Sequence, residues 1–446
     1  MDRIRNKSAA ALGRAIEDGT LDPIDLAEFY FDEIKSCNVS DRIYARLMRE
    51  RAGEEAQAAR ARQKSGTRRG LLDGVPVSWK DLFNTKGIAT EAGSALYRDN
   101  IPMSDAAVLQ CATQAGLVAL GKTHMSELAF SGLGLNPITA TSPCVNDAGA
   151  VSGGSSSGAA ASVAFGLAAA AIGTDTGGSV RIPAAWNDLV GFKTTSGRLS
   201  LEGVIALAPS FDTVGPIARS VEDCALLLGA LDGQDVRTGT PPDLSSLKFA
   251  VLETVAFDDI RAAPARGFDQ ALARIAAAGA KITRIEVPAV RDAMALSGVL
   301  FPAEAYATQR AQIEAAPERM FPPILDRFRA GRTVSAPDYI AGWAKLRQLR
   351  AHYLAATQPF DAVLLPTAPI LPPNVHRLME DSDYYVTENL LALRNTRIAN
   401  LMGLPGLTLP TGVASCGLLL QTLPMSEARL LAIGAAVESV LGQALT

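Results

Sequence analysis

The chain has 446 residues, of which 48% are hydrophobic and 20% are charged. This composition is typical of a globular protein and excludes a disordered, collagen-like or coiled-coil chain. The 42 Lys and Arg residues are balanced by 46 Asp and Glu residues, so the formal charge is -4. Because no excess of cations offers phosphate contacts across a broad face, we do not expect nucleic acid as the main ligand.

Neither the cysteines nor the N-terminus indicates an exported protein. The five cysteines are odd in number and scattered, with no Cys-x-x-Cys pair, which predicts free thiols rather than a disulfide framework or a zinc site. The first 19 residues lack the apolar stretch of a signal peptide, so we expect a cytoplasmic protein. The longest apolar run, Gly158–Gly173, is too short for a bilayer and contains internal glycines, which favours core packing over a membrane segment.

Helix and strand patterns alternate along the first third of the chain. Asp22 followed by Pro23 is an N-cap with proline at the first helical position, and it predicts a helix to about Cys37. The next predicted elements are a helix over about 46–63, a strand over 74–80, a helix over 105–115, a strand over 117–120 and a helix beginning near 126. This alternation predicts an α/β sheet.

The segment 148–181 is crowded with Gly, Ser and Ala, and the α/β pattern continues beyond it. The predicted elements are helices over 157–165, 221–231, 268–278, much of 288–356 and 426–441, strands over 167–172, 249–252, 281–287, 362–365, 407–409 and 418–421, and a polar loop over 232–246. We expect one domain over residues 1–446: a helical region to about 65, a core over about 70–230, and a variable C-terminal half over about 247–446 that shapes the substrate site.

Two familiar patterns do not fit their surroundings. Gly116–Thr123 matches the P-loop expression, but an apolar strand lies between its glycines, where an irregular phosphate-binding turn is needed. Gly154–Gly158 matches Gly-x-Ser-x-Gly, which would make Ser156 a nucleophile, but a polar loop precedes it instead of an apolar strand. None of the three histidines is a clear base for such a serine.

A buried lysine can replace histidine as the base for a serine, because burial disfavours the ammonium form and lowers its pKa. Lys80 lies at the carboxyl end of a predicted strand, where ligands bind in open α/β sheets. Ser179 ends the glycine-rich run Gly173–Ser179, which follows another strand and leaves backbone N–H groups accessible to an oxyanion. A helix of about 16 Å that starts near Ser155 and a returning strand of about 20 Å permit Ser155 and Ser179 to meet.

These residues resemble the amidase signature family. The resemblance lies in Lys80 after a strand, in the run Gly153–Gly158 with Ser155, and in the run Gly173–Pro183 with Ser179, 24 positions after Ser155. It implies an α/β fold whose large mixed, mostly parallel β-sheet is sandwiched between α-helices. It also implies that Ser179 is the nucleophile, that Ser155 follows a cis peptide bond and relays a proton, and that Lys80 is the base. The backbone N–H groups implied for the oxyanion hole are those of Thr176, Gly177, Gly178 and Ser179.

The function that this resemblance implies is cleavage of a small-molecule carboxylic amide to a carboxylate and ammonia or an amine, through an acyl-enzyme and without a metal or organic cofactor. The alternative is the glutamine-hydrolysing A subunit of a tRNA-dependent amidotransferase, although the tyrosine-rich segment typical of those subunits has no match in 325–351. The family also suggests a homodimer. The stretch His124–Leu128 departs from relatives that carry Asn and Asp before the glutamate, which leaves substrate contacts of that loop open.

The residues that select the substrate are not placed by sequence. A substrate with a carboxylate needs a cation in the pocket, whereas an arylamide needs aromatic side chains. Asp175 and Arg181 are expected to pair as part of the scaffold. The unplaced candidates are Arg181, Arg310, Arg394 and Arg397 among the cations, and Phe130, Tyr306 and Trp343 among the aromatic residues.

Overall fold

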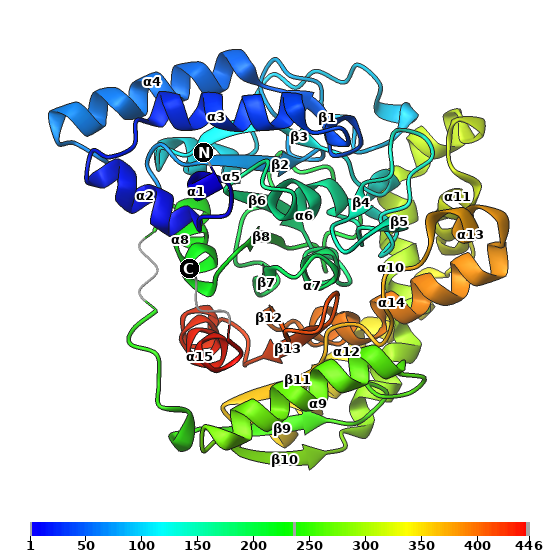
Figure 1. The fold of residues 1–446 in the computed structure, drawn as a ribbon. Coiled ribbons are helices and arrows are strands. Elements are labelled where there is room, and N and C mark those ends of the chain that lie inside the picture. Colours follow the sequence, from blue (N-terminus) through cyan, green and yellow to red (C-terminus); the bar gives the residue numbers. More distant parts are fainter. Residues whose placement is uncertain (1, 235–237, 443–446) are drawn as a thin grey trace.

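A computed structural model describes residues 2–234 and 238–442. One eleven-stranded sheet runs through the molecule, from the N-terminal half at the top of Figure 1 to the C-terminal half at the bottom. Its strands, in spatial order, are β1 (Tyr44–Leu47), β3 (Val118–Thr123), β2 (Pro76–Lys80), β6 (Ala170–Thr174), β8 (Val214–Ala218), β7 (Val190–Lys193), β12 (Gly406–Pro410), β13 (Gly417–Gln421), β11 (Ala362–Pro366), β9 (Lys248–Leu252) and β10 (Lys281–Ile285). A separate pair is formed by β4 (Pro143–Cys144) and β5 (Asp147–Val151).

The predicted α/β class and mixed sheet are confirmed, but the expected predominance of parallel pairs needs correction. Among the described strands of the large sheet, six neighbouring pairs are antiparallel and four are parallel. The parallel pairs lie toward the two ends, where crossovers separate the strands. In the middle, β12 and β13 are joined by a connection too short for a parallel crossover, so they pair antiparallel.

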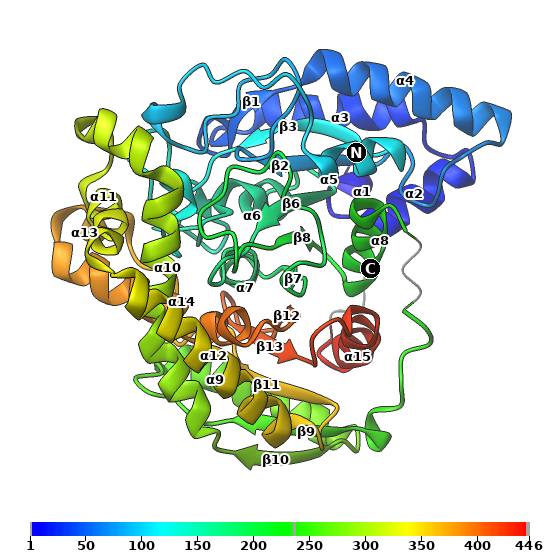
Figure 2. The same cartoon turned by 180° about the vertical axis from the view of Figure 1, so that it is seen from behind.

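Helices pack on both faces of the sheet. They are α1 (Asp2–Arg5), α2 (Ala9–Glu17), α3 (Pro23–Ser36), α4 (Arg49–Ser65), α5 (Ala107–Gln114), α6 (Ser157–Ala164), α7 (Arg181–Trp186), α8 (Val221–Asp232), α9 (Ala262–Ala277), α10 (Pro288–Ala315), α11 (Pro322–Arg329), α12 (Ala336–Thr357), α13 (Val375–Glu380), α14 (Ser382–Met402) and α15 (Glu427–Val440). At the lower end of the sheet α9 lies in front in Figure 1, and α12 lies in front in the opposite view of Figure 2. The helices α10, α11, α13 and α14 gather at one side, next to α7.

Local signals account for the helices that were predicted well. The Asp22 carboxylate accepts a hydrogen bond from the Ile24 N–H at 2.8 Å, and Pro23 opens α3 as expected. Helix α4 ends at Gly66, which adopts the left-handed conformation that glycine favours at this position. The start predicted for α4, near Arg46, is wrong because β1 pairs there with β3.

The helix predicted near Ser126 is also wrong. The chain forms only a single 3-10 turn at Glu127–Ala129, and Leu128 and Ala129 both have positive φ, which an α-helix cannot contain. The predicted polar loop over 232–246 includes 235–237, which lie outside the described residues. None of the described helices is long and apolar enough to cross a membrane.

The glycine- and serine-rich segment is tightly packed against other backbone. A side chain on Gly154 would lie 2.5 Å from the Gly134 nitrogen, and one on Gly158 would lie 2.5 Å from the Ile43 oxygen. Small residues therefore let α6 and the loop before it lie close to the backbone at Ile43 and Gly134. One hydrophobic cluster includes residues from Ala9 to Leu441, and the large sheet is continuous. Both features are consistent with a single domain, which stays a prediction.

Candidate active site

Lys80 is the last residue of β2, and its side chain is completely buried. Its Nζ donates hydrogen bonds to Ser155 Oγ at 2.7 Å and to Thr174 Oγ1 at 2.8 Å. Burial lowers the pKa of Lys80 to about 7, and the negative charges of Asp212 and Asp175 only partly oppose this shift. A large fraction of the amine is therefore neutral near pH 7 and can accept a proton.

The two serine segments lie side by side. The peptide bond between Gly154 and Ser155 is cis, and the Ser155 carbonyl accepts a hydrogen bond from the Ser126 N–H at 3.1 Å. The Ser156 N–H donates to the Ser179 carbonyl at 3.2 Å, so the loop before α6 is fixed directly to the loop after β6. The Ser156 hydroxyl donates to the Thr174 carbonyl at 3.2 Å, which adds a second hydrogen bond from this loop to the end of β6.

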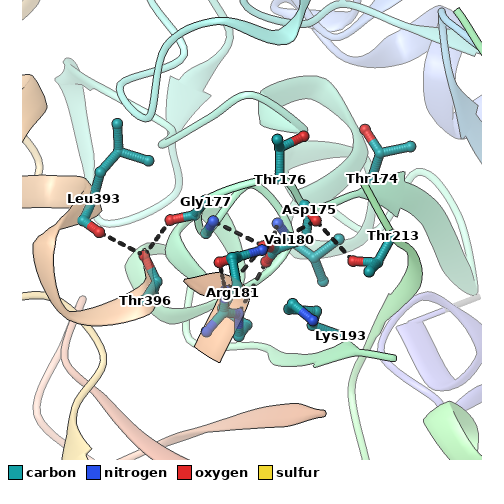
Figure 3. A network of polar contacts seen from close by, with 12 residues as sticks. Thr174, Asp175, Thr176, Gly177, Val180, Arg181, Lys193, Thr213, Leu393 and Thr396 are labelled. Atoms are coloured by element: carbon teal, nitrogen blue, oxygen red, sulfur yellow. Dashed lines mark hydrogen bonds and ion pairs between the residues drawn. The ribbon is translucent and has the colours of Figure 1, made fainter. Parts of the chain in front are cut away.

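Asp175 organises the loop that carries Ser179 (Figure 3). Its carboxylate forms a two-point ion pair with Arg181, with both N–O distances 2.9 Å, and both side chains are fully buried. The same carboxylate accepts hydrogen bonds from the backbone N–H groups of Gly178 at 2.8 Å and Val180 at 3.2 Å. Arg181 and these partners hold the pKa of Asp175 well below its usual range despite burial, so the group stays charged. The two residues are paired as expected.

Helix α14 supports this loop from the other side. Thr396 Oγ1 donates to the Gly177 carbonyl at 2.7 Å, as Figure 3 shows, and Asn400 Nδ2 donates to Asp175 Oδ1 at 2.9 Å. Gly178 has a φ of 138°, and a side chain there would collide with Thr396. Because the carbonyl of Gly177 is turned toward α14, the loop has a defined orientation beside Ser179.

The predicted oxyanion donors differ in their surroundings. The Gly178 N–H already donates to the Asp175 carboxylate, so it would have to share its proton with a bound oxyanion. Thr176 and Gly177, by contrast, line the same cavity as Ser179. The Thr176 hydroxyl donates to Asp212 Oδ1 at 2.5 Å, which fixes the side chain at this position.

A mostly apolar cavity of about 210 Å³ opens next to Ser179, whose residue surface is only 4% exposed. Its other walls come from the segment after β3 and from α10, α11 and α14. The lining residues are Ala129, Phe130, Ser131, Thr176, Gly177, Ser179, Leu207, Ser297, Gly298, Phe301, Pro302, Arg327, Ala330, Leu390, Leu393 and Arg397. A cavity of this size and lining can hold a small or medium-sized apolar group next to the Ser179 hydroxyl.

Two of the seven residues considered for the substrate pocket line this cavity. They are Phe130 and Arg397; the other candidates, Arg181, Arg310, Arg394, Tyr306 and Trp343, do not line it. Sequence reasoning missed Arg327, because nothing in the sequence pattern of α11 distinguishes a pocket arginine from a surface one. Among the described residues, no group of three or more His, Cys, Asp and Glu side chains is placed to hold a metal ion.

Comparisons with known proteins find relatives that match most of the chain. The family model for amidase matches residues 25–431. The chain is 36% identical over 407 residues to 2-amino-5-chloromuconic acid deaminase of Comamonas testosteroni, which covers 88% of this chain and 87% of that protein. It is 33% identical over 489 residues to the A subunit of the glutamyl-tRNA(Gln) amidotransferase of Thermobifida fusca (strain YX), covering 99% and 97% of the two chains.

A solved structure shares the fold over almost its whole length. A crystal structure of an amidase superimposes with a TM-score of 0.87 at 30% identity, covering 98% of this chain and 100% of that one. The family match, the identity to relatives over most of the chain and this structural likeness lead to one conclusion. The chain belongs to the amidase signature family of enzymes.

Proposed function

We propose that this protein is an amidohydrolase that uses Ser179 as nucleophile, Ser155 as proton relay and Lys80 as base. The observation that carries the proposal is a buried lysine with a pKa of about 7 whose Nζ lies 2.7 Å from Ser155 Oγ. The Ser155 segment is in turn fixed to the Ser179 segment through the Ser156 N–H. These are the elements of an activated serine in a site without a catalytic histidine.

The first chemical step is acylation of Ser179. Neutral Lys80 accepts the proton of Ser155 Oγ while Ser155 accepts the proton of Ser179 Oγ, and Ser179 Oγ forms a bond to the amide carbonyl carbon. The 2.7 Å separation between Lys80 Nζ and Ser155 Oγ suits transfer in either direction. When the C–N bond breaks, Ser155 gives a proton to the leaving nitrogen and recovers one from Lys80, so ammonia or an amine departs and an ester remains on Ser179.

Backbone N–H groups stabilise the tetrahedral oxyanion in this proposal. Those of Thr176, Gly177 and Ser179 are the main donors, and Gly178 contributes only if it shares its hydrogen bond with Asp175. Removing one donor of this kind costs about 3–4 kcal/mol of transition-state stabilisation in hydrolases. Water then attacks the ester carbonyl and loses a proton through Ser155 to Lys80. When the bond between the carbonyl carbon and Ser179 Oγ breaks, that proton returns through Ser155 to Ser179 Oγ, and the acid leaves as a carboxylate after giving its own proton to solvent.

The proposal is tested by labelling the serine with a fluorophosphonate, followed by intact-mass analysis and peptide mapping. We expect one adduct, on Ser179, that is absent in Ser179→Ala and retained in Ser156→Ala. Thermal unfolding of Ser179→Ala should match that of the wild type, because the variant removes only one oxygen. An adduct on Ser156 in the wild type, or hydrolysis by Ser179→Ala at the wild-type rate, would refute Ser179 as the nucleophile.

A glutamine-hydrolysing subunit of an amidotransferase is the second candidate. It is favoured by the likeness to the amidotransferase component of Thermobifida fusca over 99% of this chain. The discriminating experiment compares ammonia release from glutamine with release from a panel of other small amides by the isolated chain. Turnover of other amides with no turnover of glutamine supports the free-standing amidohydrolase, and a preference for glutamine supports the second candidate.

A further inference from the structure

Two arginines share the cavity with Ser179. Arg327 comes from α11 and Arg397 from α14, two helices of the C-terminal half, and both side chains are only partly exposed. The Arg327 guanidinium lies over the Phe130 ring at 4.6 Å, and that of Arg397 lies 5.8 Å from the Phe301 ring. Aromatic side chains thus hold both cations in the cavity without neutralising them.

Neither guanidinium has an anionic partner within the described part of the chain. Arg397 has a single long hydrogen bond, 3.4 Å to Ser297 Oγ, and the buried Nε of Arg327 has no hydrogen-bond partner. The residues that line the cavity include no Asp and no Glu. Two other shielded arginines, by contrast, are paired: Arg181 with Asp175, and Arg46 with Asp81 at 2.7 Å.

The two cations also affect each other. Burial and, to a smaller extent, the positive charge of Arg327 together lower the pKa of Arg397 to about 9. Two like charges in an apolar cavity are costly unless an anion joins them. A planar guanidinium group matches the two oxygens of a carboxylate. A bound carboxylate would therefore reduce the repulsion between the two arginines and give the Arg327 Nε the hydrogen-bond partner that it lacks.

We propose that Arg327 and Arg397 bind a carboxylate of the substrate, so that the enzyme hydrolyses amides that carry an acid group at the far end of a short apolar chain. This inference rests on the proposed function of Ser179. The apolar walls between the arginines and the serine suit methylene groups. Glutamine fits less well, because its ammonium group would lie in a cavity with two cations and no acidic lining residue.

Binding is measured first, in a form of the protein that cannot turn over. Ser179→Ala is titrated calorimetrically with succinamate, glutaramate and adipamate, with pentanamide as the neutral counterpart of glutaramate, and with glutamine. We expect at least one of the three acids to bind roughly 100-fold more tightly than pentanamide and glutamine, because a desolvated ion pair distinguishes them. Equal binding of acid and neutral amides would overturn the inference.

The arginines are then replaced one at a time in the Ser179→Ala background and in the active enzyme. Arg327→Gln and Arg397→Gln should each weaken binding of the best acid, and lower its kcat/KM, by roughly 30- to 1000-fold, while pentanamide changes by less than about 3-fold. The matched controls are Arg329→Gln on α11, whose partner is Glu314, and Arg394→Gln on α14; both positions lie outside the cavity lining. Thermal unfolding verifies that every variant folds.

The possible outcomes separate this inference from the function on which it rests. Hydrolysis of pentanamide as fast as of every acid, with Ser179 labelled, would overturn carboxylate recognition and leave the amidohydrolase intact. Tight acid binding without labelling of Ser179 or turnover would uphold the arginine site and contradict the proposed chemistry. If the arginine substitutions reduce turnover of acid and neutral amides equally, the two residues shape the cavity and do not recognise a carboxylate.

Discussion

The segment from β2 to α7 and the C-terminal half contribute to the same cavity in different ways. The first supplies Ser179 to the cavity wall from a glycine-rich turn, with Lys80 at a strand end and Ser155 in a second glycine-rich turn behind it. The second supplies Arg327 and Arg397 from helices that carry no recognisable motif. The proposed chemistry thus depends on backbone geometry that few residue types permit, whereas the proposed specificity depends on side chains that many helical sequences could present.

Removal of the proposed base should have the largest effect on activity. Lys80→Met keeps an unbranched buried side chain but lacks the amine, so we expect kcat for a small amide to fall by roughly 10²- to 10⁴-fold. Lys122→Met is the matched control: Lys122 is also buried, on neighbouring β3, but its Nζ contacts Phe83, Thr85 and Thr90 instead of the serines. Steady-state ammonia release is the measurement. Comparable losses of kcat in both variants would show that activity depends on a buried lysine in general, and not on Lys80 as the base.

The second prediction concerns the scaffold of the Ser179 loop. Asp175→Asn leaves Arg181 buried without its counter-ion, which should lower the free energy of unfolding by about 3–5 kcal/mol and reduce activity at the same time. Urea unfolding provides the measurement. Glu253→Gln, which removes the exposed partner of Arg284, should change stability by less than about 1 kcal/mol. If Asp175→Asn is equally mild, the ion pair does not organise the loop.

The pH dependence sharpens the assignment of the base. Because Lys80 must be neutral to accept a proton and its pKa is about 7, kcat/KM should rise about tenfold per unit below pH 7 and level off above it. Glu127 has a pKa raised to about 7 by burial, so the profile must also be measured for Glu127→Gln. We expect kcat/KM of Glu127→Gln to rise with pH below pH 7 as it does in the wild type. Loss of this rise in the variant would assign it to titration of Glu127.

The smallest expected effect lies where the two regions meet. Glu127 accepts hydrogen bonds from Ser94 Oγ at 2.7 Å and from the Phe321 N–H, just before α11, at 2.9 Å. Since its pKa is raised in the folded state, this carboxyl contributes stability at low pH that is lost as the pH rises through about 7. Glu127→Gln should therefore gain thermal stability relative to the wild type between pH 5 and pH 8, with KM altered only a few-fold. A Tm difference independent of pH would contradict this.

Much of the framework, but not the cavity, was predictable from the sequence. Strands such as β2, β9 and β13 are short apolar runs bounded by turn residues, and α3 carries its own capping signals. The 3-10 turn at Glu127–Ala129 was missed because its geometry is imposed by tertiary contacts, such as that of the Leu128 N–H with the Ala92 carbonyl. The hydrogen bond of the Gly178 N–H to Asp175 likewise becomes visible only in three dimensions.

The support that α14 gives to the Ser179 loop has a consequence for biosynthesis. Thr396 and Asn400 bond to residues 219 and 225 positions earlier in the chain. Because synthesis proceeds from the N-terminus, the loop cannot acquire these hydrogen bonds until α14 has emerged from the ribosome. Nascent chains, and chains terminated before α14, should thus contain an unreactive Ser179.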